Sequence, residues 1–143
     1  MSTPSVQGSC SCGHVQYEAS LPSLWVGHCH CENCRRAQGA GIVTYAGFPK
    51  EALRFLQGEP DLTSYFNPDT SSTRRFCRLC GSTITFEAPR WPTEIHLIVA
   101  NLTSPLDKLP TGHAFADRSP AWCPITDDLP QFGGPTGTEA LES

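Results

Sequence analysis

Apolar and polar residues alternate over short stretches along most of this chain. In HVQYEASL (14–21) every second residue from Val15 to Leu21 is apolar, which is the period of a half-buried β-strand. LWVGHC (24–29) follows after two turn-forming residues and is predicted to be the antiparallel partner of this strand. The N-terminal lead before these stretches is short and polar.

The rest of the pattern predicts further strands and very little helix. ENCRRAQG (32–39) has room only for a short helix that ends at Gly39. GIVTYAGF (41–48) is rich in β-branched and aromatic residues, as strands are. PKEALRFLQG (49–58) fits either a helical turn or a strand, and we expect a turn that leads into a strand. More short strands are predicted at 62–66, 73–77, 82–88 and 94–100, with edge strands at 112–115 and 121–125.

Many short strands at regular spacing predict a mainly β fold with short helical turns. The content of 13 Pro and 12 Gly agrees with a chain that turns often. Its 143 residues are the size of one domain, which we place at residues 1–132. The remaining GGPTGTEALES (133–143) has the composition of a flexible C-terminal tail.

Composition excludes several classes of partner. The net charge is −4 and there are only two lysines, so the chain lacks the basic surface that nucleic-acid binding needs. The polar N-terminal stretch has no signal peptide, and no apolar run is long enough to span a membrane. We therefore expect a cytoplasmic protein with reduced thiols. The sequence is also compatible with a homodimer.

Eight cysteines are the main candidates for chemistry. In a reducing compartment they favour metal binding, whereas a disulfide framework would require export. Zinc in structural sites takes four tetrahedral ligands and binds thiolates well. The cysteines form three spaced groups, Cys10-x-Cys12, Cys29-x-Cys31-x-x-Cys34 and Cys77-x-x-Cys80, and Cys123 stands alone.

The spacing suggests how these groups divide between metal ions. Cys77 and Cys80 lie in a zinc-knuckle type of segment, FCRLCGS, which supplies two ligands and needs a second pair. Cys10 and Cys12 are the natural complement, and the group around Cys31 is then left with three thiols. A site with three protein ligands keeps a position for water or substrate. The alternative, in which the group of three joins the knuckle, leaves the first pair without a metal.

Four segments together resemble the glutathione-dependent formaldehyde-activating enzyme family, whose domain is shared with centromere protein V. The resemblance extends from residue 7 to residue 132. It implies coiled antiparallel sheets like those of a small zinc-binding chaperone of Rab GTPases. It also implies a structural zinc at Cys10, Cys12, Cys77 and Cys80, and a second, catalytic zinc at Cys29, Cys31 and Cys34. The segments are GSCSCGHVQYE (8–18), CHCENCRRAQG (29–39), FCRLCGSTITF (76–86) and AWCPITDDLPQF (121–132).

The family name implies condensation of glutathione with formaldehyde to S-(hydroxymethyl)glutathione, formally a carbon–sulfur lyase reaction in reverse. In this hypothesis a small thiol takes the open position on the second zinc and becomes a thiolate. His30, or in its place His28 or His113, supplies the proton for the new alkoxide. Arg35 and Arg36 are expected to bind the carboxylates of glutathione. Cys123 belongs to no metal motif and is expected to pack.

Two other functions stay open at this point. A non-catalytic zinc-stabilised binding or chaperone-like module would close its three-cysteine site with a fourth protein ligand, such as His30 or His113. In that case Arg35 and Arg36 would only offset thiolate charge. A redox switch would join Cys31 and Cys34 in a disulfide, but the βαβ pattern that usually accompanies such a pair is missing from the sequence.

Overall fold

The computed structural model describes residues 4–141, which divide into two compact units, each made of two segments of chain. Among the described residues, unit 1 contains residues 4–24 and 46–108, and unit 2 contains residues 25–45 and 109–141. Each unit carries its own cysteines and is described separately below. The assignment of residues 1–132 to a single domain stays a prediction.

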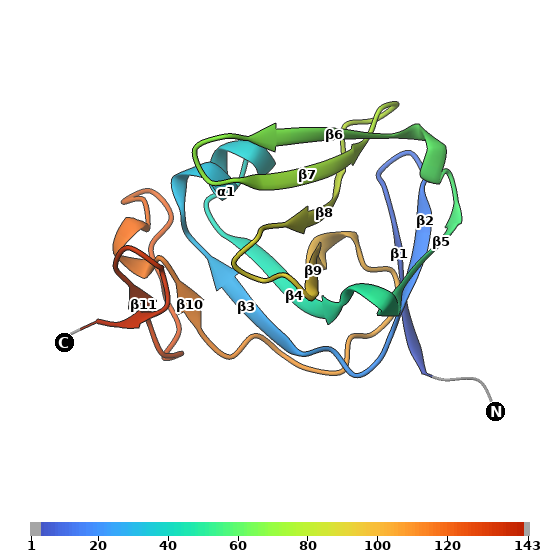
Figure 1. Ribbon diagram of the computed structural model, residues 1–143. Coiled ribbons are helices and arrows are strands. Elements are labelled where there is room, and N and C mark those ends of the chain that lie inside the picture. The colour runs from blue at the N-terminus through green and yellow to red at the C-terminus, as the bar shows by residue number, and fades with distance from the viewer. Residues whose placement is uncertain (1–3, 142–143) are drawn as a thin grey trace. The chain divides into compact units, whose positions relative to one another are not determined.

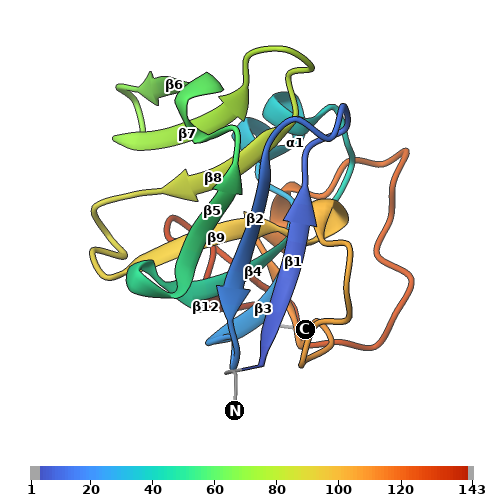
Figure 2. The same ribbon diagram turned by 90° about the vertical axis from the view of Figure 1, so that its right-hand side faces the viewer.

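Unit 1 contains two groups of hydrogen-bonded strands. The first has the order β1-β2-β5, and these three strands lie side by side in Figure 2. The second has the order β9-β8-β7-β6, whose outer pair, β6 and β7, runs side by side in Figure 1. All of these pairings are antiparallel. The strands are β1 (Ser5–Ser9), β2 (Gln16–Ser20), β5 (Leu53–Gln57), β6 (Leu62–Asn67), β7 (Ser72–Cys77), β8 (Thr83–Glu87) and β9 (Glu94–Ile98).

The strand β1 was not expected from the sequence, and it changes the predicted pairing of β2. All but the first residue of the predicted partner of β2, residues 24–29, belongs to unit 2, whereas β2 pairs with β1 and β5. In β1, Val6 is fully buried, and Gly8 lies opposite Tyr17 of β2. A Cβ atom at Gly8 would lie 2.3 Å from the Tyr17 ring, so only glycine leaves room for that ring. The polar N-terminal segment therefore forms a strand, and this strand covers the buried ring of Tyr17.

The interior of unit 1 is mostly apolar, although Thr85 is fully buried there and Arg74 and His96 are nearly so. Short 3₁₀ turns, η1 (Lys50–Ala52), η2 (Glu59–Asp61) and η3 (Val99–Asn101), connect its strands. The first of these leads directly into β5, which confirms the predicted turn followed by a strand. The largest side chains of unit 1 with almost no exposure include Val6, Val15, Tyr17, Phe48, Ile84 and Leu97.

Unit 2 is built around one parallel strand pair and a short helix. Strand β10 pairs in parallel with β3, so that His113 lies beside His28. Helix α1 ends before Gly39, as predicted, and is the one α-helix among the described residues. Strand β4 begins in unit 2 and ends in unit 1. The elements are β3 (Trp25–Cys29), α1 (Glu32–Gln38), β4 (Val43–Pro49), β10 (His113–Ala114), η4 (Ala116–Arg118), β11 (Phe132–Gly133) and β12 (Glu139–Ala140).

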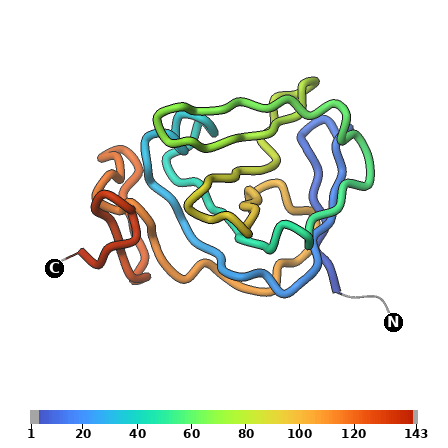
Figure 3. The backbone as a smooth tube through the Cα atoms, viewed as in Figure 1, coloured from blue at the N-terminus to red at the C-terminus, as the bar shows by residue number. Residues whose placement is uncertain are grey.

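The C-terminal part of unit 2 differs from the sequence prediction in two places. The predicted edge strand at 121–125 is wrong, because these residues form turns and irregular chain, with a hydrogen bond from the Cys123 N–H to the Pro120 carbonyl. Within the predicted flexible tail, β12 returns to pair with β11, and the red end of the tube in Figure 3 shows this reversal. The Phe115 N–H also bonds the Gly137 carbonyl. The last two residues of the predicted tail, 142–143, lie outside the described residues.

The predicted fold class is confirmed. The described chain is mainly β, and it contains one short α-helix. The strand pairs described above in unit 1 and the β11–β12 pair are antiparallel, whereas β3 and β10 are parallel, as is an isolated bridge between His113 and Gln131. No helix in residues 4–141 is both long and apolar enough to cross a membrane.

Candidate functional site

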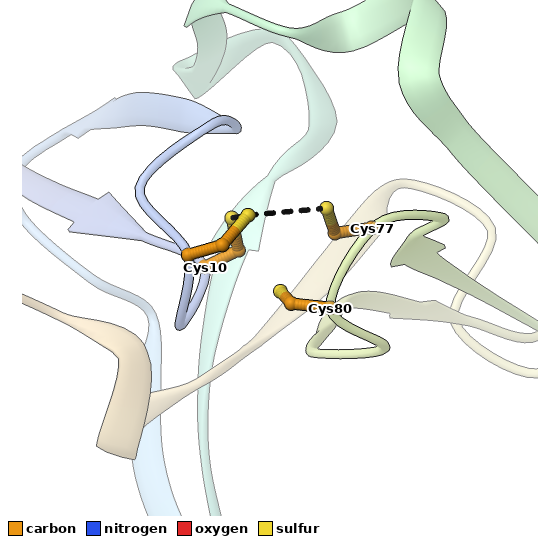
Figure 4. A group of neighbouring side chains, drawn as sticks. Cys10, Cys77 and Cys80 are labelled. Carbon is orange, nitrogen blue, oxygen red and sulfur yellow. Dashed lines mark hydrogen bonds between the residues drawn. The ribbon is translucent and has the colours of Figure 1, made fainter.

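Four cysteines of unit 1 form the first candidate metal site, which we call the four-cysteine cluster (Cys10, Cys12, Cys77 and Cys80). Their sulfur atoms all lie within 4.8 Å of one another. One pair comes from the turn between β1 and β2, and the other from the last residue of β7 and the turn that follows it. Figure 4 shows the side chains of Cys10, Cys77 and Cys80 turned toward one another. The grouping that spacing predicted for these residues is present in the structure.

Hydrogen bonds in the four-cysteine cluster favour the thiolate forms of Cys10 and Cys80. At Cys12 a backbone hydrogen bond lowers the pKa, but burial and the neighbouring thiols outweigh it and raise the pKa to about 11. The Val15 N–H points at the Cys10 sulfur over 3.2 Å, and together with neighbouring thiols it outweighs burial and lowers the pKa of Cys10. Hydrogen bonding by Ser82, first through its hydroxyl and then through its backbone, lowers the pKa of Cys80 to about 5. The same hydroxyl also accepts the Ser11 N–H over 2.9 Å. Ser82 thus connects the two turns that carry the sulfurs.

A second connection between these turns runs through Asp61. One carboxylate oxygen of Asp61 accepts a hydrogen bond from His14, which follows the first cysteine pair. The other accepts from Arg78 Nε over 2.7 Å, inside the second pair. The Arg78 N–H also donates to the Asp61 carbonyl. Bonds from His14 first, and from Arg78, lower the pKa of the Asp61 carboxyl. We call this arrangement the Asp61 clamp.

Three cysteines of unit 2 form the second candidate site, the three-cysteine cluster (Cys29, Cys31 and Cys34). Cys29 ends β3, Cys31 caps the N-terminus of α1 and Cys34 lies in its first turn. The Cys34 N–H donates to the Cys31 sulfur over 3.3 Å, so one thiol serves both the helix and the cluster. Cys34 is buried, and the other two are partly exposed. The pKa of Cys29 is raised, first by its bonds with Cys31 and Cys34 and then by burial.

The geometry of both clusters fits zinc. Zinc–sulfur bonds of about 2.3 Å place the corners of a tetrahedron about 3.8 Å apart. The sulfurs of Cys10 and Cys12 are 3.6 Å apart, those of Cys12 and Cys77 3.9 Å, and those of Cys29 and Cys34 3.6 Å. None of the eight cysteines, all within the described residues, is in a disulfide. Each cluster could therefore hold one metal ion.

The three-cysteine cluster has no fourth protein ligand within residues 4–141. Neither a histidine nor a carboxylate belongs to the group of donor atoms that includes Cys31. His30 and His113, the candidates for such a ligand, are bonded to each other, His30 Nε2 to His113 Nδ1 over 2.7 Å. The second ring nitrogen of His113 contacts Asp127 over 2.8 Å. Within residues 4–141 the group of donor atoms that could hold a metal ion here therefore consists of three sulfurs.

The histidines predicted as candidates lie together in unit 2. His30 and His113 are completely or almost completely buried, at 0% and 1% exposure. The ring of His28 stacks on that of His113 at 4.9 Å, and its Nδ1 bonds the Thr44 hydroxyl over 2.7 Å. Burial, and then the neighbouring His113, lowers the pKa of His30 to about 4. His30 is therefore neutral at pH 7.

The two predicted arginines and Cys123 differ in exposure and in the groups that they contact. Arg35 donates from Nε to the His30 carbonyl over 3.0 Å and from Nη2 to the Arg118 carbonyl over 3.3 Å. Its guanidinium thus braces the backbone of the three-cysteine cluster, whereas Arg36 is exposed on the helix. Cys123 packs against the backbone of Gly41, where a Cβ would lie 2.6 Å from its sulfur.

The sequence analysis did not predict a role for two aspartates that contact candidate site residues. Asp61 and Asp127 form their contacts with residues far along the chain, and neither lies in a cysteine motif. The segment around Asp127 offered the only signal, because AWCPITDDLPQF is one of the four segments that carry the resemblance.

Comparison with known proteins agrees with the cysteine pattern. The family model described as glutathione-dependent formaldehyde-activating enzyme matches residues 5–118. A crystal structure of a Rhodobacter sphaeroides protein, a structural-genomics target, has 32% sequence identity and a TM-score of 0.58. That match covers 73% of this chain and 97% of the Rhodobacter chain. None of the curated proteins compared with the chain matches it.

Proposed function

The chain belongs to the glutathione-dependent formaldehyde-activating enzyme family, and on this basis we propose that it is a zinc-dependent enzyme of the carbon–sulfur lyase type. Its proposed reaction is the joining of a small thiol, of which glutathione is the first candidate, to formaldehyde. The four-cysteine cluster is assigned a structural zinc and the three-cysteine cluster a catalytic one.

One observation supports this proposal above the others. The donor group around Cys31 contains three sulfurs, and the described part of the chain adds no fourth ligand to it. Zinc sites with three protein ligands are typical of catalysis, and those with four are typical of structure. Zinc bound by three thiolates would accept a substrate sulfur as its fourth ligand and lower the pKa of that thiol.

The protein's own groups then account for proton movement and binding. We assign to His30 the transfer of the proton from the substrate S–H to the new alkoxide. Arg36 is exposed, so it is assigned to a carboxylate of the thiol substrate. Arg35 keeps N–H groups beyond the two that bond carbonyls, and these are assigned to a second carboxylate.

The chemical step conserves its atoms without any further reactant. The sulfur lone pair attacks the formaldehyde carbon, a carbon–sulfur bond forms, and the C=O π electrons move to oxygen. His30 returns the proton that it took from sulfur to this oxygen. The product is the S-hydroxymethyl thioether, and the reverse sequence releases formaldehyde.

An exchange experiment tests the proposal. Zinc-loaded protein is added to glutathione and ¹³C-labelled formaldehyde at equilibrium, and the exchange between free and adduct label is measured by NMR. We expect the protein to accelerate exchange well above the spontaneous rate, and the Cys34→Ser variant to lose this acceleration. Cys123→Ser, which alters a thiol outside both clusters, serves as the matched control and is expected to retain it.

The main alternative makes a different prediction for the same sample. A non-catalytic zinc module would hold both metals, bind no thiol and leave the exchange rate unchanged. X-ray absorption at the zinc edge distinguishes the two, because the enzyme gains one sulfur neighbour when glutathione is added and the module does not. An unchanged spectrum together with an unchanged exchange rate would refute the proposed reaction.

A further inference from the structure

Strand β6 lies at one end of the β9-β8-β7-β6 group of unit 1. Among residues 4–141 it pairs with β7 alone, and Figure 1 shows it as the outermost of these four strands. Its exposed side chains include two large aromatic ones, Tyr65 at 55% and Phe66 at 57% exposure. Because successive side chains of a strand point to opposite faces, the two rings lie on opposite faces of the sheet. Strand β6 thus combines an edge position with exposed aromatic surface on both faces.

The backbone groups along β6 alternate in direction. The Arg78 N–H donates to the carbonyl of Asp61, the residue before β6, over 3.0 Å. In an antiparallel pair every second residue faces the partner strand, so Asp61 and the alternate residues after it direct their N–H and C=O groups toward β7. The residues between them direct these groups away from β7, and they are Leu62, Ser64 and Phe66. A second extended chain that aligns with β6 could form backbone hydrogen bonds with all three.

Strand β6 lacks the features that prevent edge strands from pairing with other molecules. Proteins usually protect such strands with charged residues, prolines, bulges or a covering segment. In the three-strand group of unit 1, β1 is covered, since the Thr103 N–H donates to the Gln7 carbonyl and the Gln7 N–H to the Ser104 hydroxyl. At the other end of that group, β5 carries a charged residue, Arg54. The sequence of β6, LTSYFN, contains no charged residue or proline, and its register with β7 is continuous.

We propose that β6 pairs with β6 of a second copy of this chain, forming an antiparallel homodimer whose two-fold axis passes through Ser64. In this register Ser64 lies opposite Ser64 of the second copy and Leu62 lies opposite Phe66, so the outward-facing residues are the ones that exchange hydrogen bonds. Thr63 then lies opposite Tyr65. Both aromatic rings thus meet an aliphatic or β-branched side chain, which is a favourable cross-strand pair.

Charge also favours a second copy as the partner strand. Residues 62–67 are uncharged, so no like charges oppose each other within the paired segment. Asp61 lies opposite Asn67 of the second copy, whose amide can donate to that carboxylate. Stable, specific interfaces bury about 1,200–2,000 Å² in total, and one pair of six-residue strands buries less. We therefore expect a reversible dimer whose population rises with protein concentration.

Analytical ultracentrifugation of the full zinc-loaded chain over a concentration series gives the first test. The mass of wild type should rise from that of one chain, 15.5 kDa, toward twice that value. Phe66→Lys places a charge opposite Leu62 and should keep the mass at one chain. Leu56→Lys is the matched control, because it alters a leucine of β5 with nearly the same exposure, 56%, and should dimerise as wild type does. Circular dichroism and zinc content establish that both variants are folded.

Amide hydrogen exchange in wild type, followed by NMR at low and high protein concentration, gives a second test that needs no variant. The N–H groups of Ser64 and Phe66 should exchange more slowly at high concentration, whereas those of Thr63 and Tyr65, which already face β7, should change little. A wild type that stays monomeric throughout, a dimer in which Ser64 and Phe66 gain no protection, or a Phe66→Lys variant that still dimerises would each overturn the proposed dimer. None of these outcomes affects the proposed reaction, because β6 contains none of the residues assigned to it.

Discussion

The two cysteine clusters differ in the distance along the sequence that separates their ligands. The four-cysteine cluster of unit 1 takes its sulfurs from two turns, residues 10–12 and 77–80. The three-cysteine cluster of unit 2 takes all of its sulfurs from residues 29–34. A site assembled from distant turns stabilises the tertiary fold when metal binds, because the ligands converge only in the folded state. A local site contributes less to the fold and can leave a position open.

The two units also bury different kinds of side chain. The large side chains with almost no exposure in unit 1 are mostly apolar, among them Phe48, Ile84 and Leu97, whereas those described in unit 2 are His30, His113 and Val26. A buried polar group costs free energy unless it is hydrogen-bonded, and His30 is only partly satisfied. Unit 1 also buries hydroxyls without a partner among the described residues, those of Tyr17 and Thr85, so the contrast is that two of the three most buried large side chains described in unit 2 are imidazoles.

Removal of one ligand from the four-cysteine cluster should have the largest effect. Cys77 is completely buried, and Cys77→Ser is expected to release the unit 1 metal and to cost on the order of 10 kcal/mol, the scale of small structural zinc sites. That is comparable with the whole stability of a typical domain, about 5–15 kcal/mol, so most of the protein should be unfolded. Circular dichroism and metal analysis of the purified variant measure this.

Cys123→Ser provides the control for that experiment, since its thiol belongs to neither cluster. It should retain two zinc ions per chain and a melting temperature close to wild type. If Cys77→Ser instead melted like Cys123→Ser, the structural role assigned to the four-cysteine cluster would have to be given up.

Removal of one ligand from the three-cysteine cluster should leave a folded but inactive protein. Serine at position 31 can still accept the Cys34 N–H and cap α1, because serine is a favoured N-cap residue. Cys31→Ser is therefore expected to lose one zinc of two and at least about 100-fold in rate, with little loss of stability. Metal analysis, thermal melting and the formaldehyde exchange assay report these three quantities separately.

Cys31→Ala separates the capping role of this thiol from its ligand role. It should lose the same metal and, in addition, about 1 kcal/mol relative to Cys31→Ser, because alanine cannot cap the helix. If both variants melted far below wild type, unit 2 would depend on its metal as strongly as unit 1, and the contrast between the clusters would disappear.

The sequence predicted those parts of the molecule that depend on local pattern. Alternation located the strand around Tyr17, and Gly39 located the end of α1. Cysteine spacing also predicted which thiols group together, because a turn of two to five residues brings its own sulfurs close. Ligand counting then favoured the pairing of the first and last groups.

Pairing between distant segments could not be predicted in the same way. The β1 strand is recognised only when Tyr17 is seen to lie over Gly8. The pairing of β3 with β10 carries no local signal, since β10 is only two residues long. His113 and Asp127 reach His30 through that pairing, so the hydrogen-bond chain is a property of tertiary structure.

The smallest predicted effect concerns the Asp61 clamp, which joins two turns that lie far apart in the sequence, whereas the ligands of the three-cysteine cluster are already joined by the chain. Asp61→Ala removes the bonds to His14 and Arg78 but no ligand, so the two turns lose a restraint in the metal-free protein. We expect about a tenfold weaker affinity for the structural zinc, the lower end of the effect of residues outside the ligand shell. Competition with a chromophoric chelator measures this, with Asp69→Ala, which alters an exposed aspartate of the same unit, as control. Equal affinity in the two variants would mean that Ser82 and the strand pairing alone hold the turns together.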